Sequence, residues 1–387
     1  MSLAGEKQEA EERLWDKAGA WRGVGIAVGI FALTRIGQLI MLGWLDAADD
    51  DPVGLRQRLL VWDAGWFLRV AVNGYPHGYT YEGGVLQGNE LAFFPVYPLL
   101  IRFVAALGIP ASTAALVVSW LASIGAAVAV HLLATSLYNK RVGWALVAIC
   151  FSAPVSIVFS MAYSEGIFLA LIAGMLVAAH RRIWWAAGLL GLLTALTRPT
   201  GAAAAVALGV AALLAVRESR VKAWQPITAA AVALAGVPLF LAWVGWRVGD
   251  PAAWFRIQAA GWGTAFDYGS STVSFVATTL STGDSWVPVS VALILLAALA
   301  AAGVALARRP WPPLAVYGVI AMVLVYGQAG FYHSKPRLLV PVLLTLLPAA
   351  LAVARARPRV AVVSIVAWAL FGLWYGAYLV TVWPYTL

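Results

Sequence analysis

Asp63 and a small group of cations are the residues of this sequence whose chemistry suits a group transfer. Asp63 lies in the aromatic run Trp62-Asp63-Ala64-Gly65-Trp66. A positioned carboxylate can act as a general base and take the proton of a hydroxyl group. Partial burial among aromatic side chains would suit Asp63 to that role. The alternative is a solvated carboxylate within an aromatic belt at a membrane interface.

The candidate cations are Arg198 and the segment that contains His333, Lys335 and Arg337. Arginine binds a phosphate group through paired hydrogen bonds, and lysine supplies a compact positive charge. The late cluster therefore predicts a binding site for the phosphate of a lipid-phosphate donor. Contact with anionic lipid headgroups is the alternative, and Arg198 has the further alternative of reaching out to the headgroup layer.

Other residues are candidates for the wall of a substrate pocket. Glu165 begins a predicted span, where a helix N-terminus favours a carboxylate, so a capping role alone would also account for it. Pro95 and Pro98 interrupt regular hydrogen bonding, which at membrane depth requires cover by protein or a cavity; a proline-kinked helix is the alternative. The pocket candidates are Trp62, Trp66, Arg69, Tyr97 and Glu165.

The composition of the chain indicates a membrane protein, so these residues would be positioned by membrane-spanning helices. The chain has 387 residues, of which 62% are hydrophobic and 11% charged, whereas soluble domains have about 45–50% and 25%. Its net charge of +9 comes from short basic clusters between apolar runs, which indicates membrane topology and no nucleic-acid partner. The single cysteine, Cys150, excludes a disulfide within the chain and argues against zinc chemistry.

The apolar runs predict an all-α polytopic protein with about 11 transmembrane helices. The predicted spans are 22–45, 112–137, 142–161, 165–180, 184–198, 201–216, 225–247, 286–307, 313–330, 337–353 and 359–383. The run 92–108 is also apolar but contains prolines and an arginine. We expect residues 1–21 to be a cytoplasmic segment, with no cleavable signal peptide, and residues 22–387 to form a single membrane domain.

Basic clusters set the orientation, because short loops rich in Lys and Arg stay in the cytoplasm. The clusters are Lys140-Arg141, Arg181-Arg182, Arg217 to Lys222, Arg308-Arg309 and Arg355 to Arg359. They share the N-terminal side only if 92–108 does not cross the membrane. We therefore expect 92–108 to be an interfacial helix in an outer loop, 46–111, with a second outer loop at 248–285 and the C-terminus outside. Asp63, Arg198 and the 333–337 segment then share the outer face.

The outer loops contain no paired-aspartate motif that would clamp a metal ion, so we expect no metal. Asp49-Asp50-Asp51 is the one run of carboxylates there. We interpret it as a solvated loop, with a metal site as the alternative.

Several motifs in this order resemble the GT-C superfamily of membrane glycosyltransferases, and most closely its PIG-V-like (GPI mannosyltransferase II-like) family, in a prokaryotic form. The resemblance runs from Trp62 to about Arg337. Its carriers are Trp62-Asp63 with Phe67 and Gly74-Tyr75, Phe93 to Pro98, Ser152-Ala153-Pro154 with Tyr163-Ser164-Glu165, and Arg198-Pro199-Thr200-Gly201.

This resemblance implies a GT-C-like fold and an inverting transfer of mannose from a polyprenyl-phosphate-mannose donor to a lipid or glycan acceptor. It implies that Asp63 is the base and that the 333–337 segment serves the donor phosphate. The site would face the extracytoplasmic side of a bacterial plasma membrane, or the ER lumen in a eukaryote. Eukaryotic relatives carry Asn where Ser152 stands and Ser-Asn where Pro199 and Thr200 stand, which leaves the acceptor open.

Two other functions remain as alternatives. A transporter of lipids or lipid-linked sugars would move its substrate without covalent transfer, although transporters commonly show paired halves that this sequence lacks. A scaffold subunit would use its outer basic sites to bind membrane lipids and would need a protein partner for activity.

Overall fold

The computed structural model describes residues 3–218 and 223–385, and it confirms an all-α polytopic architecture. The basic cluster predicted from Arg217 to Lys222 lies partly outside the described residues, as do the first and last two residues of the predicted domains. Among the described residues, six helices are long and apolar enough to cross a membrane, or seven if one bent pair is a single span. The figure of eleven spans stays a prediction.

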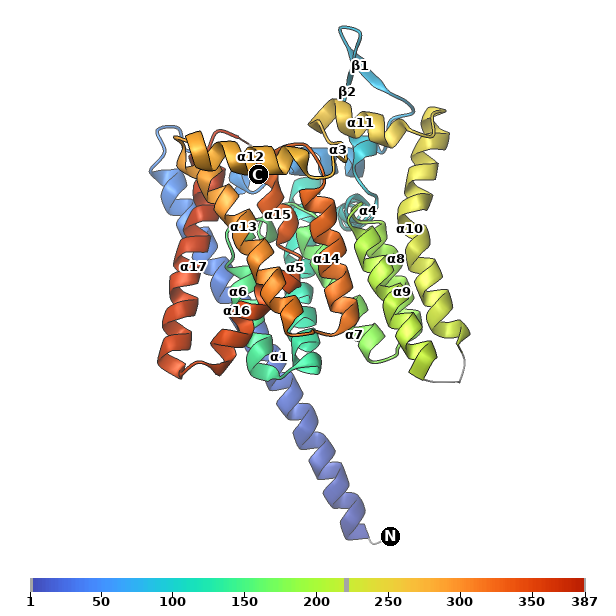
Figure 1. Ribbon diagram of the computed structural model, residues 1–387, viewed down its shortest axis with the longest axis vertical. Helices are drawn as coiled ribbons and strands as arrows, with labels where there is room; N and C mark the ends of the chain where they lie inside the picture. Colours follow the sequence, from blue (N-terminus) through green and yellow to red (C-terminus); the bar gives the residue numbers. More distant parts are fainter. Residues whose placement is uncertain (1–2, 219–222, 386–387) are drawn as a thin grey trace.

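Long helices form the body of the molecule (Figure 1). The helices that correspond to the predicted spans are α1 (Leu3–Ala47), α5 (Ala111–Leu137), α6 (Lys140–Phe151), α7 (Glu165–His180), α8 (Trp184–Ala195), α9 (Gly201–Glu218), α10 (Trp224–Val248), α13 (Trp286–Ala307), α14 (Pro312–Tyr326), α15 (Lys335–Leu339) with α16 (Leu343–Arg355), and α17 (Pro358–Thr381). The predicted N-terminal segment continues directly into the first span as α1. Helices α15 and α16 meet at a bend of 58°.

Shorter elements gather at the end of the bundle away from the N-terminus (Figure 1). They are α2 (Leu55–Arg58), α3 (Asp63–Asn73), η1 (Glu90–Ala92), α4 (Val96–Ala105), α11 (Ala253–Trp262), α12 (Ser270–Thr282) and η3 (Tyr332–Ser334). Strands β1 (Thr80–Glu82) and β2 (Val85–Gln87) form an antiparallel hairpin in which Tyr81 faces Leu86. The regions 46–111 and 248–285 therefore both carry short helices, and most of the run 92–108 is the ten-residue helix α4.

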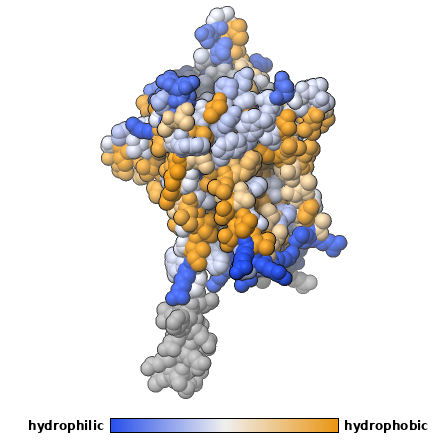
Figure 2. All heavy atoms as spheres, turned by 90° about the vertical axis from the view of Figure 1, so that its left-hand side faces the viewer, coloured by the Kyte–Doolittle hydropathy of each residue, from blue (hydrophilic) through white to orange (hydrophobic). Residues whose placement is uncertain are grey.

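The surface divides into bands along the bundle axis. On the face drawn in Figure 2, apolar side chains cover the middle of the bundle, and hydrophilic residues gather toward both ends. The connection from α16 to α17, which holds basic residues, lies at the end from which α1 projects, and the C-terminus lies at the other end (Figure 1). Which end faces the cytoplasm remains a prediction.

Helix α6 ends earlier than predicted. The span 142–161 was predicted as one helix, but the helix stops at Phe151 and only the short turn η2 (Ser156–Phe159) follows. Pro154 has no N–H to continue a helix, and Val155 has a positive φ of 69°. The prediction was wrong in its second half, because hydropathy alone does not register a break whose polar groups find partners inside the protein.

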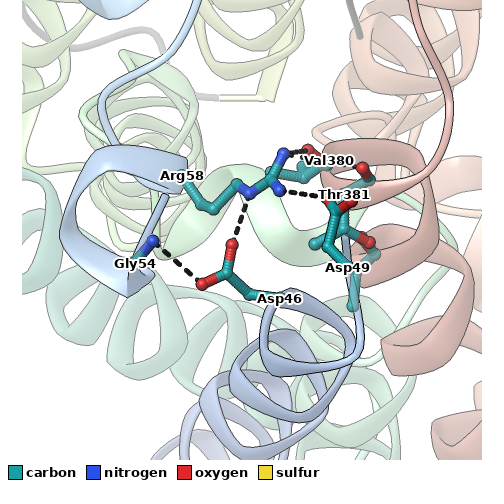
Figure 3. Close-up of polar contacts among 7 residues, drawn as sticks. Asp46, Asp49, Gly54, Arg58, Val380 and Thr381 are labelled. Atoms are coloured by element: carbon teal, nitrogen blue, oxygen red, sulfur yellow. Dashed lines mark hydrogen bonds and ion pairs between the residues drawn. The ribbon is translucent and has the colours of Figure 1, made fainter. Parts of the chain in front are cut away.

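An ion-pair cluster ties the first outer loop to the ends of two long helices (Figure 3). Arg58 of α2 pairs with Asp46 at 2.7 Å and with Asp49 at 2.5 Å. Its guanidinium also donates to the carbonyl oxygen of Val380 at 3.2 Å, near the end of α17. A cation at a helix C-terminus also interacts favourably with the helix dipole. The cluster therefore fixes the start of the 46–111 region against α1 and α17.

A second set of contacts fixes the middle of that region to the end of α10 and the residues that follow it. Arg247 donates to the carbonyl oxygens of Tyr75 and Pro76, both at 2.7 Å. The Tyr79 hydroxyl donates to the Asp250 carboxylate, which holds the pKa of Asp250 below its ordinary value. The 46–111 region is thus attached to the helical bundle at its start and at its middle.

Candidate functional site

A cavity of about 610 Å³ lies where the outer loops meet the ends of α7, α9 and α15. Five charged side chains line it: Asp63, Glu165, Arg198, Lys335 and Arg337. They come from four separate parts of the sequence, and all were singled out as candidate site residues. Three cations against two carboxylates leave one positive charge in this lining.

Asp63 is the first residue of α3, where the helix N-terminus favours a negative charge. The backbone before it is strained, because Trp62 has a positive φ of 56°, a conformation that costs a non-glycine residue about 1–3 kcal/mol. This turn brings both Trp62 and Asp63 into the cavity lining. The Asp63 side chain retains 23% of its exposure and forms an ion pair with Arg337, with Oδ2 and Nη1 2.8 Å apart.

Glu165 begins α7 and is nearly completely buried, with a side-chain exposure of 2%. Its Oε1 atom lies 2.6 Å from Arg198 Nη1 and 3.4 Å from Arg337 Nε. Burial of an unpaired carboxylate would be costly, and these two arginines compensate for it. Arg198, Glu165, Arg337 and Asp63 therefore form one continuous charged chain along the cavity.

Lys335 forms no direct ion pair with a carboxylate among the described residues. Its ammonium group donates to the carbonyl oxygens of Val325 at 2.8 Å and Gln328 at 2.6 Å. The side chain is buried, with 3% of the residue exposed, and it lines the cavity. The Asp267 carboxylate, which does not line the cavity, interacts with this ammonium only electrostatically. A buried ammonium whose hydrogen-bond partners are neutral attracts an anion.

The irregular segment after α6 positions Glu165, and a buried arginine in α1 holds that segment. Arg35 is fully buried. Its guanidinium donates to Ser156 O at 2.7 Å, to Ser160 Oγ at 3.1 Å and to Phe151 O. These bonds satisfy backbone groups that the end of α6 leaves free at membrane depth. Sequence reasoning missed Arg35, although an arginine inside an apolar span is itself a signal of function.

Two of the predicted pocket residues, Arg69 and Tyr97, lie outside the cavity lining. The Arg69 guanidinium carbon lies 3.9 Å from the centre of the Trp66 ring, and Nε pairs with Glu90 at 2.7 Å. Tyr97 is fully buried and bonds to Ser119 Oγ at 2.6 Å. Trp66 does line the cavity.

His333 lies beside the cavity and not in its lining. It is buried, and its ring stacks on that of Phe331 with the centroids 5.4 Å apart. The neighbouring residues Ser334, Lys335 and Arg337 do reach the cavity. The structure thus brings the two cations of the predicted phosphate-binding segment to Asp63 and leaves the histidine among aromatic rings.

The run of three aspartates lies apart from this cavity. Asp49 pairs with Arg58, and Asp50 and Asp51 are exposed. Within residues 3–218 and 223–385, no group of three or more His, Cys, Asp or Glu side chains is placed to hold a metal ion.

The sequence and the fold of this chain were each compared with those of known proteins. No family model matches the chain. It is 36% identical over 138 residues to GPI mannosyltransferase 2 of Drosophila pseudoobscura pseudoobscura, covering 32% of this chain and 27% of that protein. It is 32% identical over 167 residues to GPI alpha-1,6-mannosyltransferase 2 of Mus musculus, covering 40% and 32%. The matches therefore span about a third or less of either relative.

The fold resembles that of ArnT from Cupriavidus metallidurans, solved in a complex with undecaprenyl phosphate. The TM-score is 0.54 at 15% sequence identity, with 90% of this chain and 64% of ArnT covered. Similarity at this level of identity concerns the fold alone. Taken together, the comparisons show that the chain shares the overall fold of ArnT and that about a third of its sequence is similar to part of GPI mannosyltransferase 2.

Proposed function

We propose that this chain is an inverting glycosyltransferase that moves mannose from a polyprenyl-phosphate-mannose donor to an acceptor hydroxyl at the extracytoplasmic membrane face. The observation that carries the proposal is the pairing of a carboxylate, Asp63, with an excess of positive charge in one cavity. The names of the sequence relatives support mannose as the sugar. The lipid phosphate bound to ArnT supports a polyprenyl phosphate as its carrier.

The proposed reaction is a single displacement at the anomeric carbon of the donor. Asp63 takes the proton of the acceptor hydroxyl, and the acceptor oxygen forms a bond to C1 of mannose. The bond from C1 to the phosphate oxygen breaks, and its electron pair leaves with the polyprenyl phosphate. Lys335 and Arg337 stabilise the negative charge on that phosphate, and Arg198 holds Glu165 in place beside them. One displacement inverts the configuration at C1.

Arg337 links the two halves of this mechanism, because it is paired with the proposed base. A donor phosphate that approaches Lys335 competes with Asp63 for Arg337. Binding of the donor would thereby weaken the Asp63–Arg337 ion pair and leave the carboxylate available to the acceptor. The reaction as proposed uses side-chain cations in place of a metal ion, so EDTA should leave turnover unchanged.

A transfer assay with purified protein in lipid nanodiscs tests this proposal. The probe is undecaprenyl phosphate [14C]mannose, with a membrane lipid extract as the source of acceptor hydroxyls. Transfer converts the label from the acid-labile sugar phosphate into an acid-stable glycoside. Failure of the wild-type protein to form any acid-stable product would refute the transferase.

The transporter alternative makes a different prediction for the same protein. In liposomes, a transporter would move labelled lipid-linked sugar between leaflets while the sugar-phosphate bond stayed intact. The position of the charged cavity residues favours transfer, because Asp63, Glu165 and Lys335 are each the first residue of a helix and not in its middle.

A further inference from the structure

Beside Asp63 the cavity has an aromatic wall that the proposed reaction does not yet use. Trp66 stands three residues after Asp63 in α3, so the two side chains lie on one helix face about one turn apart. Phe93 stacks against Trp66 with centroids 5.7 Å apart. Trp262, the last residue of α11, meets both rings edge-to-face at 5.4 Å. All three rings line the cavity.

A close contact between two glycines places Trp262 in this wall. Gly88 follows β2, and Gly261 precedes Trp262 in α11. A Cβ atom added to Gly88 would lie 2.6 Å from Gly261 Cα and 2.9 Å from Trp262 Cζ3, and one added to Gly261 would lie 2.7 Å from Gly88 Cα. Backbone therefore packs directly on backbone here, and the Trp262 ring rests on Gly88.

This contact joins the two outer regions of the chain. Gly88 belongs to the region 46–111 and Gly261 to the region 248–285, and Figure 1 shows the hairpin and α11 next to each other above α3. Neither glycine has a positive φ. Their small size is needed for the close approach, and any side chain at either position must displace the Trp262 ring or separate the two regions.

The chemistry of this wall suits a sugar ring. One face of a pyranose presents C–H groups, whose partial positive charge complements the negative face of an indole. Its hydroxyl groups need polar partners at the rim, and Gln258 and Thr264 line the same part of the cavity as Trp262. Apolar walls with a few placed polar groups are typical of small-molecule sites. Gln258 Nε2 also donates to the carbonyl oxygen of Ala92 at 3.2 Å, which holds this amide at the cavity wall.

We propose that Trp262, held by the Gly88–Gly261 contact, is a specificity-determining residue that binds the C–H face of a pyranose ring beside Asp63. This inference deepens the proposed function and rests on it for the identity of the reaction. The ring could belong to the transferred sugar of the donor or to the acceptor. The experiment below separates these two sources.

Saturation-transfer NMR on nanodisc-embedded protein tests the proposal without requiring turnover. The probe is methyl α-D-mannopyranoside, and D-mannitol serves as an open-chain probe that has hydroxyl groups but no ring face. We expect a ring C–H signal for the mannoside that exceeds the mannitol signal at least fivefold. Trp262→Ala and Gly88→Ala should each reduce it at least fivefold, and Trp262→Phe should retain part of it.

Gly78→Ala is the matched control. Gly78 belongs to the same outer region as Gly88, and a Cβ atom added to it would meet nothing within 4 Å. It should leave the signal unchanged. Binding of undecaprenyl phosphate should be the same in Trp262→Ala as in the wild type, which shows that the variant is folded and that the phosphate site is intact. An unchanged mannoside signal in Trp262→Ala, or equal signals for mannoside and mannitol in the wild type, would overturn the proposal.

Two further measurements separate the sources and the two proposals. Saturating undecaprenyl phosphate mannose, added to the Asp63→Asn variant, should displace the mannoside if Trp262 holds the donor sugar and leave its signal intact if Trp262 holds the acceptor. If the transferase proposal is wrong, the [14C]mannose assay alone would show it, because no acid-stable product would form. Loss of the Trp262 proposal would appear in the NMR signal, whether or not mannose is transferred.

Discussion

At the scale of single residues, the site depends on Asp63 being both a base and a partner of Arg337. In the resting pair, Asp63 Oδ2 lies 2.8 Å from Arg337 Nη1, so this oxygen has a partner until Arg337 turns to another anion. The donor phosphate is the natural competitor, because arginine binds phosphate at least as well as carboxylate. This competition makes opposite predictions for catalysis and for binding.

Asp63→Asn should lower the rate of mannose transfer by about 10²- to 10⁴-fold, the usual effect of losing a general base. The same variant should bind undecaprenyl phosphate more tightly, by about 3- to 10-fold, because Arg337 then keeps only Glu165 of its two carboxylate partners. Single-turnover kinetics and equilibrium binding in nanodiscs measure the two effects. Asp284→Asn, an exposed carboxylate outside the cavity lining, is the control. Full activity in Asp63→Asn would remove Asp63 from the role of base.

Lys335 is expected to dominate the affinity for the donor phosphate, because it forms no direct ion pair with a described carboxylate, whereas Arg337 and Arg198 do. Lys335→Met should weaken binding of undecaprenyl phosphate by about 10- to 100-fold, the range of a hydrogen bond to a charged group. Lys335→Arg should restore much of the affinity by restoring the charge. Lys140→Met, which removes an exposed lysine at the start of α6, should have no effect. Equal affinity in wild type and Lys335→Met would place the phosphate elsewhere.

At the scale of elements, the broken segment between α6 and α7 decides where Glu165 lies. Helix α6 ends within the predicted span 142–161, and the freed carbonyl groups of Phe151 and Ser156 accept from Arg35. Trp120 donates to the carbonyl oxygen of Ser160 at 3.1 Å, and Ser119 to that of Tyr163 at the same distance. Side chains of α1 and α5 thus replace the helical hydrogen bonds that the segment lacks.

Arg35→Met should leave these carbonyl groups without partners, at a cost of about 1–3 kcal/mol for each buried group. We expect a lower thermal unfolding midpoint in detergent and a lower transfer rate, because Glu165 loses its fixed position. Arg35→Lys should recover part of both, since an ammonium still supplies donors but cannot span as many acceptors. Arg22→Met, on an exposed position of the same helix, is the control. An Arg35→Met protein as stable as the wild type would show that the segment between α6 and α7 keeps its structure without Arg35.

Most helices could be placed from the sequence, because an apolar run of about 20 residues is the length that a membrane span requires. The sequence also predicted that Asp63, Arg198 and the 335–337 cations share one side of the membrane, since that followed from counting crossings between basic clusters. It did not predict the end of α6 at Phe151, because the partners of the break come from α1 and α5, far away in the sequence. For the same reason it placed Tyr97 in the pocket, although the Tyr97 hydroxyl points to Ser119.

The aromatic wall is a second feature that could not be predicted from the sequence alone. Trp262 is one of 19 tryptophans in the chain, and nothing in its neighbourhood distinguishes it from an interfacial belt residue. Only the approach of Gly88 to Gly261 brings it to Trp66. Short-range motifs identified the charged residues and Trp66, whereas the place of Trp262 depends on a contact between the two outer regions.

At the scale of the whole molecule, the fold separates its basic connectors from its charged cavity by the length of the bundle. On the face drawn in Figure 2, apolar side chains lie between the two hydrophilic ends. Positively charged connectors are retained in the cytoplasm, so the cavity should open on the extracytoplasmic side. A polyprenyl-phosphate donor used there must present its sugar on that same side. The orientation of the chain is therefore part of the functional proposal.

Cysteine labelling in intact cells tests this orientation with little background, because the native Cys150 is fully buried. Tyr81→Cys places a thiol on the exposed hairpin beside the cavity, and Arg357→Cys places one on the exposed connection before α17. A maleimide that cannot cross membranes should label Tyr81→Cys in intact cells and Arg357→Cys only after permeabilisation. The reverse pattern would put Asp63 in the cytoplasm, where the chain would need a donor that faces inward. Labelling of both in intact cells would contradict the separation of the two ends by a bilayer.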